Sequence, residues 1–273
     1  MQAANSALAR TSATMATSAP ARLLQRFTGK SIVVTGGGAG IGAAIVAAFL
    51  REGGRVTSLD LRHPPAPAAA AGAGAARAVE LAVDVSSSAA VEAAFARIGD
   101  VDVLVNNAAS FMFRDIVAST DADWDAALSV NIRGYANTMR AAVRGMRARG
   151  RGGAIVNVSS MSGLLCQESF VPYSTSKAAQ LHMTRLVALD EGKHGIRVNA
   201  VCPGPILTDG TRRHAKDLGQ SLEKVCADMV SNLAIKRMGQ PHEVAAAVLF
   251  LASDEASFTT GAALNVEAGY TLS

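Results

Sequence analysis

The chain has 273 residues, of which 49% are hydrophobic and 18% are charged, and its formal net charge is +4. No apolar stretch is long enough to span a membrane. The basic residues are dispersed apart from one group near the end of a long predicted helix, where cations favour the helix C-terminus and we expect a solvated face. This group comprises Arg140, Arg144, Arg147, Arg149 and Arg151. Composition therefore argues against a membrane protein and against a nucleic-acid partner.

The first 27 residues differ in composition from the rest of the chain. They are rich in Ala, Ser and Thr, carry three arginines and contain no acid. Organelle transit peptides have this composition, and so do disordered extensions of alanine-rich chains. Because alanine is abundant throughout, we expect a disordered N-terminal extension over 1–27 and one dinucleotide-binding catalytic domain over 28–273. Organelle targeting is the alternative.

The three cysteines, Cys166, Cys202 and Cys226, show no paired metal-binding spacing. The histidines near them form no ligand set. We therefore expect reduced thiols, no metal site and a cytoplasmic location.

Strand-like runs alternate with helical runs along the chain. Length alone allows one large α/β domain or two smaller ones, but this alternation predicts one continuous parallel sheet with helices on both faces. The fold class is therefore α/β, a single Rossmann-type doubly wound domain. A proline-rich segment at 63–76 is expected to form a surface connection near the adenosine pocket. The predicted strands are 31–35, 55–60, 79–83, 101–106, 154–159, 196–201 and 263–266.

A glycine run over 35–42 joins the first predicted strand to a helix. In this context, glycines let the backbone approach a pyrophosphate, whose charge is held by the helix N-terminus. Two registers fit, Gly38-x-Gly40-x-x-Ala43 and Gly36-x-x-x-Gly40-x-Gly42. A flexible glycine loop is the alternative, which the flanking strand and helix disfavour.

The second predicted strand ends in Asp60, twenty residues after Gly40. A carboxylate here would accept hydrogen bonds from the adenosine ribose of NAD, whereas the 2′-phosphate of NADP would meet like charge. Positions 37 to 39 lack a basic residue that could pair with such a phosphate. Arg62 lies two residues further on and could weaken the exclusion. The sequence favours NAD over NADP.

Tyr173 and Lys177 lie four residues apart in a predicted helix, so their side chains share one face. A phenol has an unperturbed pKa near 10, and a neighbouring cation lowers it, which makes the pair a candidate general acid/base. Ser160 stands thirteen residues before Tyr173, after the strand at 154–159. Ser159 is a competing hydroxyl.

With these motifs in this order, the chain from about Lys30 to the C-terminus resembles a classical short-chain dehydrogenase/reductase. The catalytic residues that the resemblance implies are Asn131, Ser160, Tyr173 and Lys177. The implied cofactor-binding residues are Gly36, Gly38, Gly40, Ile41, Gly42, Asp60, Asp84, Val85, Asn107, Ala108, Tyr173, Lys177, Pro203, Gly204, Ile206 and Thr208. Two departures from the family pattern affect the scaffold: Ala109 replaces a glycine, and Glu267-Ala268-Gly269 replaces the more usual Asp-Gly-Gly.

The resemblance implies a role for each catalytic residue. Tyr173 would exchange a proton with the substrate oxygen, and Ser160 would donate a hydrogen bond to the same oxygen. Lys177 would lower the phenol pKa and bind the nicotinamide ribose. Asn131, in a helix that begins near Asp121 after a Thr120-x-x-Asp123 capping box, would hold a water that links Lys177 to solvent. An ordinary buried amide is the alternative for Asn131.

We therefore expect an NAD(H)-dependent oxidoreductase that acts on a small secondary alcohol or ketone. An NADPH-dependent carbonyl or 3-oxoacyl reductase is the alternative. A non-catalytic dinucleotide-binding sensor or scaffold is disfavoured, because it would be expected to lose the tyrosine or lysine. The resemblance, together with the apolar helix from Tyr173 to Glu191 and the long helix around Asn131, predicts a homotetramer. The expected substrate pocket is mainly apolar and includes Phe111, Met112, Phe113, Leu164, Leu165, Phe170 and Leu207.

Overall fold

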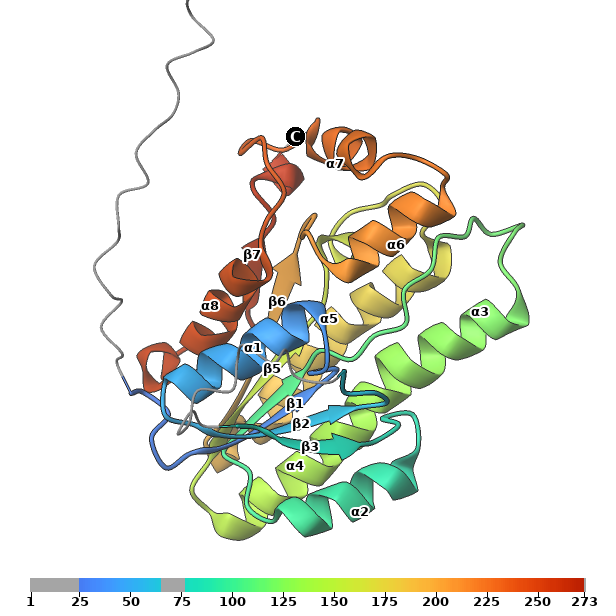
Figure 1. Ribbon diagram of the computed structural model, residues 1–273. Helices are drawn as coiled ribbons and strands as arrows, with labels where there is room; N and C mark the ends of the chain where they lie inside the picture. Colours follow the sequence, from blue (N-terminus) through green and yellow to red (C-terminus); the bar gives the residue numbers. More distant parts are fainter. Residues whose placement is uncertain (1–24, 65–76, 273) are drawn as a thin grey trace, which may run out of the picture.

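The computed structural model describes residues 25–64 and 77–272. Seven parallel strands form one sheet with helices on both faces (Figure 1), as the sequence predicts. The expectations for residues 1–24 and for most of the proline-rich connection lie outside the described residues. Within the described part of the chain, none of the helices combines the length and apolar character needed to cross a membrane.

The predicted strands agree with the observed ones to within about two residues at each end. The strand order in the sheet is β3-β2-β1-β4-β5-β6-β7. The strands are β1 Ser31–Thr35, β2 Arg55–Asp60, β3 Val79–Ala82, β4 Val103–Asn106, β5 Gly153–Val158, β6 Ile196–Pro203 and β7 Ala263–Val266.

Eight α-helices are found in the described residues: α1 Gly40–Arg51, α2 Ser88–Ile98, α3 Asp121–Ala126, α4 Tyr135–Arg149, α5 Val171–Glu191, α6 Asp209–Asp217, α7 Leu222–Val230 and α8 Pro241–Ala252. A π-helix over Ala127–Gly134 joins α3 to α4, so the three segments form one long helix. The predicted capping box at Thr120 and Asp123 begins this helix.

Side chains that alternate along each central strand enter two separate hydrophobic layers. On one face, Ile32 and Val34 of β1 pack in a core with α1 and α8. On the other face, the intervening Val33 packs in a core with α2, α4 and α5. Period-2 alternation between two buried faces explains why the strand reads as a continuous apolar run. The two layers of helices therefore cover both faces of the sheet.

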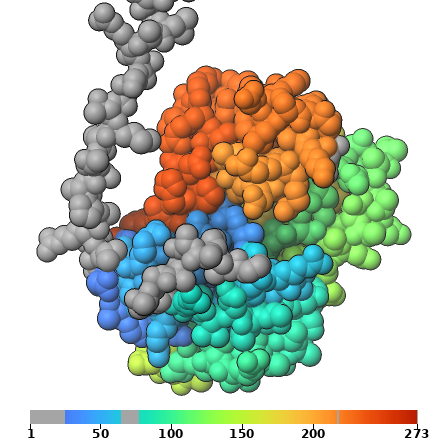
Figure 2. Space-filling view, in the orientation of Figure 1, coloured from blue at the N-terminus to red at the C-terminus, as the bar shows by residue number. Residues whose placement is uncertain are grey.

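The strand order reverses between β1 and β4, which are hydrogen-bonded neighbours. Connections from these two strands leave in opposite directions, so a crevice forms above their carboxyl ends, where ligands bind in open α/β sheets. The glycine loop follows β1, and residues 107–110 follow β4. Figure 2 shows the orange segment that contains α6 and α7 next to the blue segment that contains α1. The topology thus brings the predicted motifs to one edge of the sheet.

The N-terminal boundary of the fold lies earlier than predicted. Phe27 is only 2% exposed and packs edge-on against Phe49, with ring centroids 4.7 Å apart. Arg26 forms an ion pair with Glu52 at 2.8 Å. Residues 25–27, which the sequence analysis assigns to the extension, therefore belong to the folded chain.

The prediction of a solvated arginine face near the end of α4 is wrong for Arg149. Its side chain is 7% exposed, and its guanidinium lies 3.3 Å from the Asp102 carboxylate. Arg147 pairs with the buried Glu191 of α5. Arg151 and Arg144 are exposed, and exposed ion pairs contribute little to stability. The buried arginine ties α4 to the loop before β4, a contact that helix periodicity does not show.

Residues 267–269, where the sequence departs from the family pattern, keep a backbone conformation typical of glycine at Ala268. Ala268 has φ = +57°, in the left-handed region that costs an L-residue roughly 1–2 kcal/mol. Its carbonyl oxygen accepts hydrogen bonds from the Ala234 and Ile235 amides at 2.8 and 3.1 Å. These bonds hold the C-terminal segment against residues 234–235 despite the substitution.

Candidate active site

The glycine loop between β1 and α1 has a backbone that other residues would disrupt. Gly36 and Gly40 have φ angles of +65° and +54°. A side chain at Gly36 would lie 2.8 Å from the Ala108 Cα atom, and one at Gly42 would overlap the Gly36 carbonyl oxygen. These constraints favour the Gly36-x-x-x-Gly40-x-Gly42 register. Since α1 begins at Gly40, the N–H groups of its first turn, which includes Ile41, point toward the crevice.

Asn107 connects the end of β4 to the glycine loop. Its side-chain Nδ2 donates to the carbonyl oxygens of Thr35 and Gly36 at 3.1 and 3.0 Å. The Thr35 hydroxyl accepts the backbone N–H groups of Asn107 and Ala108 at 2.9 and 3.1 Å. Asn107 and Thr35 therefore hold the glycine loop in place by joining the ends of β1 and β4, the two strands between which the strand order reverses.

Asp60 lies at the end of β2, beside the glycine loop. Its Oδ2 accepts the Gly38 N–H at 2.9 Å, and its Oδ1 accepts the Arg62 N–H at 3.2 Å. A carboxylate has about four acceptor positions, so two remain for a ligand's hydroxyl groups. His63, which the sequence analysis did not assign to the site, lies 3.0 Å from the Ser58 hydroxyl.

Asp84 and Val85 follow β3 at the same edge. Asp84 is exposed, and its Oδ1 accepts the Ser86 N–H at 2.8 Å. Val85 is buried, and its carbonyl oxygen accepts the Asn137 Nδ2 at 3.0 Å. This contact attaches the loop to α4.

The turn after β6 reaches the glycine loop from the other half of the sheet. Pro203 ends β6, and the Gly204 N–H bonds to the carbonyl oxygen at the end of β7 at 3.0 Å. Ile206 is buried, and Thr208 forms the N-cap of α6. A side chain at Gly40 would lie 3.6 Å from the Thr208 Cβ atom. The turn and the start of α1 therefore face one another across a narrow gap.

Tyr173 and Lys177 lie in the first two turns of α5, and both are buried. The Lys177 Nζ is 5.5 Å from the centre of the Tyr173 ring. Burial raises the pKa of Tyr173 to about 12, and the Ser160 hydroxyl acts in the opposite direction. Burial lowers the pKa of Lys177 to about 7. The predicted lowering of the phenol pKa by the lysine is therefore not seen in the protein alone, where loss of hydration dominates the pKa of Tyr173.

The two candidate serines have different roles. The Ser159 hydroxyl donates to the Lys177 carbonyl oxygen at 2.9 Å, so it attaches β5 to α5. The Ser160 hydroxyl instead bonds to the Ser162 hydroxyl at 3.1 Å, and Ser162 donates to Gln167 Oε1 at 2.5 Å. Ser160 is thus the serine that stands beside the phenol.

The Asn131 side chain lies in the π-helix and is fully buried. Its Oδ1 accepts the Ser110 N–H at 2.7 Å, and its Nδ2 donates to the Ser110 carbonyl oxygen and the Ser176 hydroxyl, both at 2.9 Å. Both the oxygen and the nitrogen of the Asn131 side chain therefore have hydrogen-bond partners, and these bonds join the loop after β4 to α5. The main-chain carbonyl oxygen of Asn131 accepts the Nε2 of Gln180 at 2.7 Å.

Gln180 is a residue that the sequence analysis missed. Its Oε1 accepts from the Lys177 Nζ at 3.2 Å, and its Nε2 donates to the Asn131 carbonyl oxygen at 2.7 Å. The Lys177 Nζ also donates to the Val158 carbonyl oxygen at 3.0 Å. The available signal was a glutamine one turn after the lysine on the same helix face.

Aromatic rings surround the exposed side of Tyr173. The Phe111 ring is 4.7 Å from the Tyr173 ring, and Phe113 is 4.4 Å from Phe170. His214 of α6 stacks on Phe113 with centroids 3.9 Å apart and planes 17° apart. Three of the predicted pocket residues therefore form a connected aromatic wall with the tyrosine, and α6 closes it from above.

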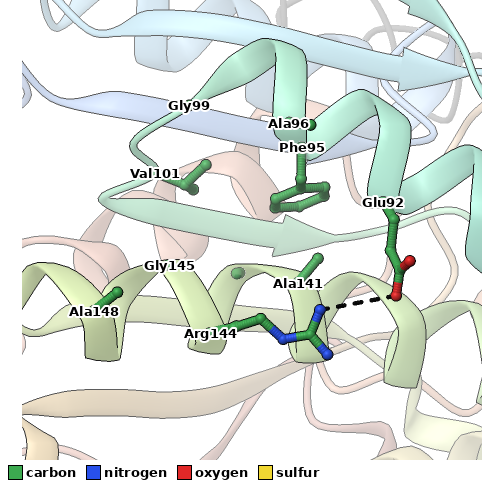
Figure 3. Close-up of a pocket in the computed structure, with 10 residues that line it drawn as sticks. Glu92, Phe95, Ala96, Gly99, Val101, Ala141, Arg144, Gly145 and Ala148 are labelled. Carbon is green, nitrogen blue, oxygen red and sulfur yellow. Dashed lines mark ion pairs between the residues drawn. The ribbon is translucent and has the colours of Figure 1, made fainter.

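A cavity of about 330 Å³ lies elsewhere, between α2 and α4 (Figure 3). The Arg144–Glu92 pair, at 3.8 Å, lies at its rim. None of its lining residues belongs to the predicted site. It is lined by Glu92, Phe95, Ala96, Gly99, Val101, Ala141, Ala142, Arg144, Gly145 and Ala148.

All three cysteines are free thiols, with Cys202 buried beneath Lys177. Across residues 25–64 and 77–272, no cluster of three or more His, Cys, Asp or Glu side chains is arranged to hold a metal ion. The glycine cradle, the start of α1 and the Asp60 carboxylate together fit a dinucleotide, since each is open to the crevice and a Cβ at Gly36 would collide with Ala108.

Comparison with known proteins agrees with this geometry. The sequence model of a family described as enoyl-(acyl carrier protein) reductase matches residues 36–271. The chain is 39% identical to 2-(S)-hydroxypropyl-CoM dehydrogenase 3 of Xanthobacter autotrophicus, over 90% of this chain and 98% of that protein. It is also 39% identical to D-xylose 1-dehydrogenase of Caulobacter vibrioides, over 89% of this chain and 96% of the relative.

A solved structure shares the fold along nearly the whole chain. Ligand-free aldohexose dehydrogenase of Thermoplasma acidophilum superposes with a TM-score of 0.82 and 34% identity, covering 91% of this chain and 96% of that one. Motif order, sheet topology and these similarities agree. The chain belongs to the short-chain dehydrogenase/reductase family of oxidoreductases.

Proposed function

We propose that the chain is an NAD(H)-dependent oxidoreductase that transfers hydride between the nicotinamide and a small secondary alcohol or ketone. The observation that carries this proposal is the buried Tyr173–Lys177 pair beside Ser160, at the edge where the glycine loop lies. When bound, the nicotinamide would supply or accept the hydride. The rest of the chemistry is a proton transfer at the substrate oxygen.

The protonation state of Tyr173 determines whether its phenol donates or accepts the proton. At neutral pH a phenol with a pKa of about 12 is protonated, so Tyr173 can donate its proton to a ketone oxygen. In alcohol oxidation Tyr173 must act as the phenolate, and the Lys177 ammonium and the Ser160 hydroxyl stabilise that form. Ser160 also donates to the substrate oxygen as charge develops on it.

The aromatic wall formed by Phe111, Phe113 and Phe170 beside Tyr173 supports a proposal for the substrate class. A carbinol carbon placed beside Tyr173 and Ser160 would direct its substituents toward Phe111, Phe113 and Phe170. Such rings favour flat or apolar groups. We therefore propose cyclic or aryl secondary alcohols and the matching ketones. The alternative is a sugar or polyol, which the similarity to D-xylose 1-dehydrogenase and to a galactitol 2-dehydrogenase of Cereibacter sphaeroides favours.

The free thiols support a reducing, cytoplasmic compartment. We also propose a homotetramer. Two groups of exposed apolar side chains support it: Leu186 and Leu189 on α5, and Phe250 of α8 with Phe258 in the segment that follows α8. Two different self-complementary surfaces on one chain produce a closed tetramer with crossing two-fold axes.

Changing Tyr173 to Phe should reduce turnover by roughly 10²–10⁴-fold, because the proton carrier is lost. Cofactor affinity should change little, since the loop and Asp60 hold the adenosine half. Steady-state kinetics with a confirmed substrate and a fluorescence titration of NADH would measure both. Thr175→Val, which removes an exposed hydroxyl from the same helix turn, is the control. Near-normal turnover of the Phe variant would show that another group carries the proton.

The wild-type enzyme should prefer NAD over NADP by at least about tenfold in kcat/KM, as expected for hydrogen bonds to a charged acceptor. Asp60→Ala should weaken the binding of NAD and narrow the difference in kcat/KM between NAD and NADP. Asp60→Asn separates two effects, because the amide oxygen can still accept the Gly38 N–H but carries no charge to repel a phosphate. Equal or better use of NADP by the wild type would show that Arg62 or another base dominates the pocket.

A panel of secondary alcohols should show aryl and cyclic members preferred over linear polyols by about tenfold or more in kcat/KM. Phe111→Ala should narrow this preference by removing the ring next to Tyr173, at a cost of about 1 kcal/mol in transition-state binding. Val79→Ala, which shortens an exposed apolar side chain on β3, away from the aromatic wall and from the proposed tetramer surfaces, is the control. A wild-type preference for xylose or threitol would support the sugar dehydrogenase alternative.

Light scattering at micromolar concentration should give about four times the 28.0 kDa chain mass. Leu189→Glu should reduce the mass by half, because Leu189 is 81% exposed on α5 and a charge there would oppose pairing. A monomeric wild type would refute the tetramer.

A further inference from the structure

Gln180 occupies a position between the catalytic lysine and the main chain of the long helix. Its side chain is 0% exposed. It accepts from the Lys177 Nζ at 3.2 Å and donates to the Asn131 carbonyl oxygen at 2.7 Å. The amide thus joins two of the residues that the family resemblance selects, at the place where a water is expected to connect them.

The hydrogen-bond partners permit only one orientation of the Gln180 amide. The Lys177 ammonium has only donors, and the Asn131 carbonyl is only an acceptor. If the amide turned over, its NH₂ group would face the ammonium and its oxygen would face the carbonyl. Both contacts would be repulsive. Each end of Gln180 therefore fixes the other, and the oxygen stays directed at Lys177.

The orientation of the Gln180 amide determines how the N–H donors of Lys177 are used. An ammonium has three N–H donors. In the described structure, one bonds to the Val158 carbonyl oxygen and one to Gln180 Oε1. Both acceptors are neutral. The third donor is left to bind the nicotinamide ribose.

The titratable groups around the ammonium come from three elements. Tyr173 lies on α5, Tyr135 on α4 with its ring centre 5.8 Å from the Nζ, and Cys202 on β6. Tyr135 donates to the same Val158 carbonyl oxygen at 2.9 Å. Burial raises the pKa of Tyr135 and of Cys202, so both are neutral near pH 7. In the described structure, dipoles of neutral groups therefore hold the charge of Lys177, and Gln180 contributes a side-chain oxygen to them.

We propose that Gln180 is a positioning residue, which keeps Lys177 charged and aims its remaining N–H at the nicotinamide ribose. This inference rests on the proposed function, because the lysine matters only if the site transfers hydride and a proton. Gln180 touches neither substrate nor cofactor. It acts through Lys177.

The test compares three variants of the full chain. Gln180→Met keeps the size of the side chain and removes both hydrogen bonds. Gln180→Glu keeps an acceptor beside Lys177 and adds a negative charge. Thr184→Val is the matched control: Thr184 is a buried polar residue one turn further along the same helix, and its hydroxyl bonds to Asn157 at 2.9 Å and to the main-chain carbonyl oxygen of Gln180 at 2.8 Å, not to the Gln180 amide or to Lys177. Thermal melting establishes that each variant is folded.

The first measurement needs neither substrate nor cofactor. Carbon-13 labelling of lysine, with Lys177→Met to assign the resonance, follows the titration of Lys177 by NMR. The pKa of Lys177 should fall by about one unit in Gln180→Met, because the charged form loses an acceptor. It should rise in Gln180→Glu, because the charged form gains a carboxylate. Thr184→Val should titrate as the wild type does.

The second measurement is kinetic. In Gln180→Met, kcat should fall about tenfold, as for a lost hydrogen bond to a charged group. The KM for the alcohol should change less than about twofold, since the substrate does not reach Gln180. A wild type without turnover on any substrate would refute the proposed function, while the NMR titration would still test Gln180. An unchanged Lys177 titration in folded Gln180→Met would overturn the inference, and so would the absence of an upward shift in Gln180→Glu if the Met variant does not fold.

Discussion

Burying the ammonium of Lys177 is the constraint on which the rest of the site depends. A charge transferred from water to a protein interior costs several kcal/mol unless polar groups replace its hydration. Lys177 is 2% exposed, and its two acceptors in the described structure are the Val158 carbonyl at the end of β5 and the Gln180 amide. Strand β5, helix α5 and the long helix that contains Asn131 must therefore stay in register with one another to within hydrogen-bond distance.

Several buried contacts that look unrelated keep that register. The Ser159 hydroxyl fixes β5 to the α5 backbone, and Ser176 receives the Asn131 amide from the long helix. On α5 one turn below Gln180, Thr184 accepts from Asn157 of β5 at 2.9 Å. Each bond satisfies a polar group that would be costly to bury alone. The Ser159 and Ser176 bonds fix the elements that carry the two acceptors of Lys177, and the Val158 and Gln180 dipoles, preorganised in this way, stabilise its charge.

The proposed cofactor-binding half of the site is also held together by hydrogen bonds between elements, but other groups form them. Here the reversal of strand order between β1 and β4 creates the crevice, and Thr35 with Asn107 joins the two strand ends that border it. The main chain of the glycine loop and the N-terminus of α1 then face the crevice without side chains in the way. On the proposed substrate side, the rings of Phe111, Phe113 and Phe170 replace polar groups. In the proposed function, one scaffold would therefore combine a charged end, a reacting centre and an apolar end within a single edge of the sheet.

Local patterns in the sequence were sufficient for the strands, the glycine loop, Asp60 and the Tyr173–Lys177 pair. In each case neighbouring positions along the chain carry the signal, such as an apolar run, a turn that excludes side chains or a four-residue helical spacing. The family resemblance added Asn131 and the turn after β6. These predictions needed only the order of the elements.

Only the tertiary structure decided which partner each buried polar side chain has. The resemblance selected Ser160, but the sequence did not show that Ser159 bonds to a helix backbone or that Arg149 is buried against Asp102. It also did not show that Gln180 bridges Lys177 and Asn131, which lies 49 residues earlier. Periodicity identifies the face on which a side chain lies, but its partner comes from another element, and that pairing exists only once the sheet has brought the elements together.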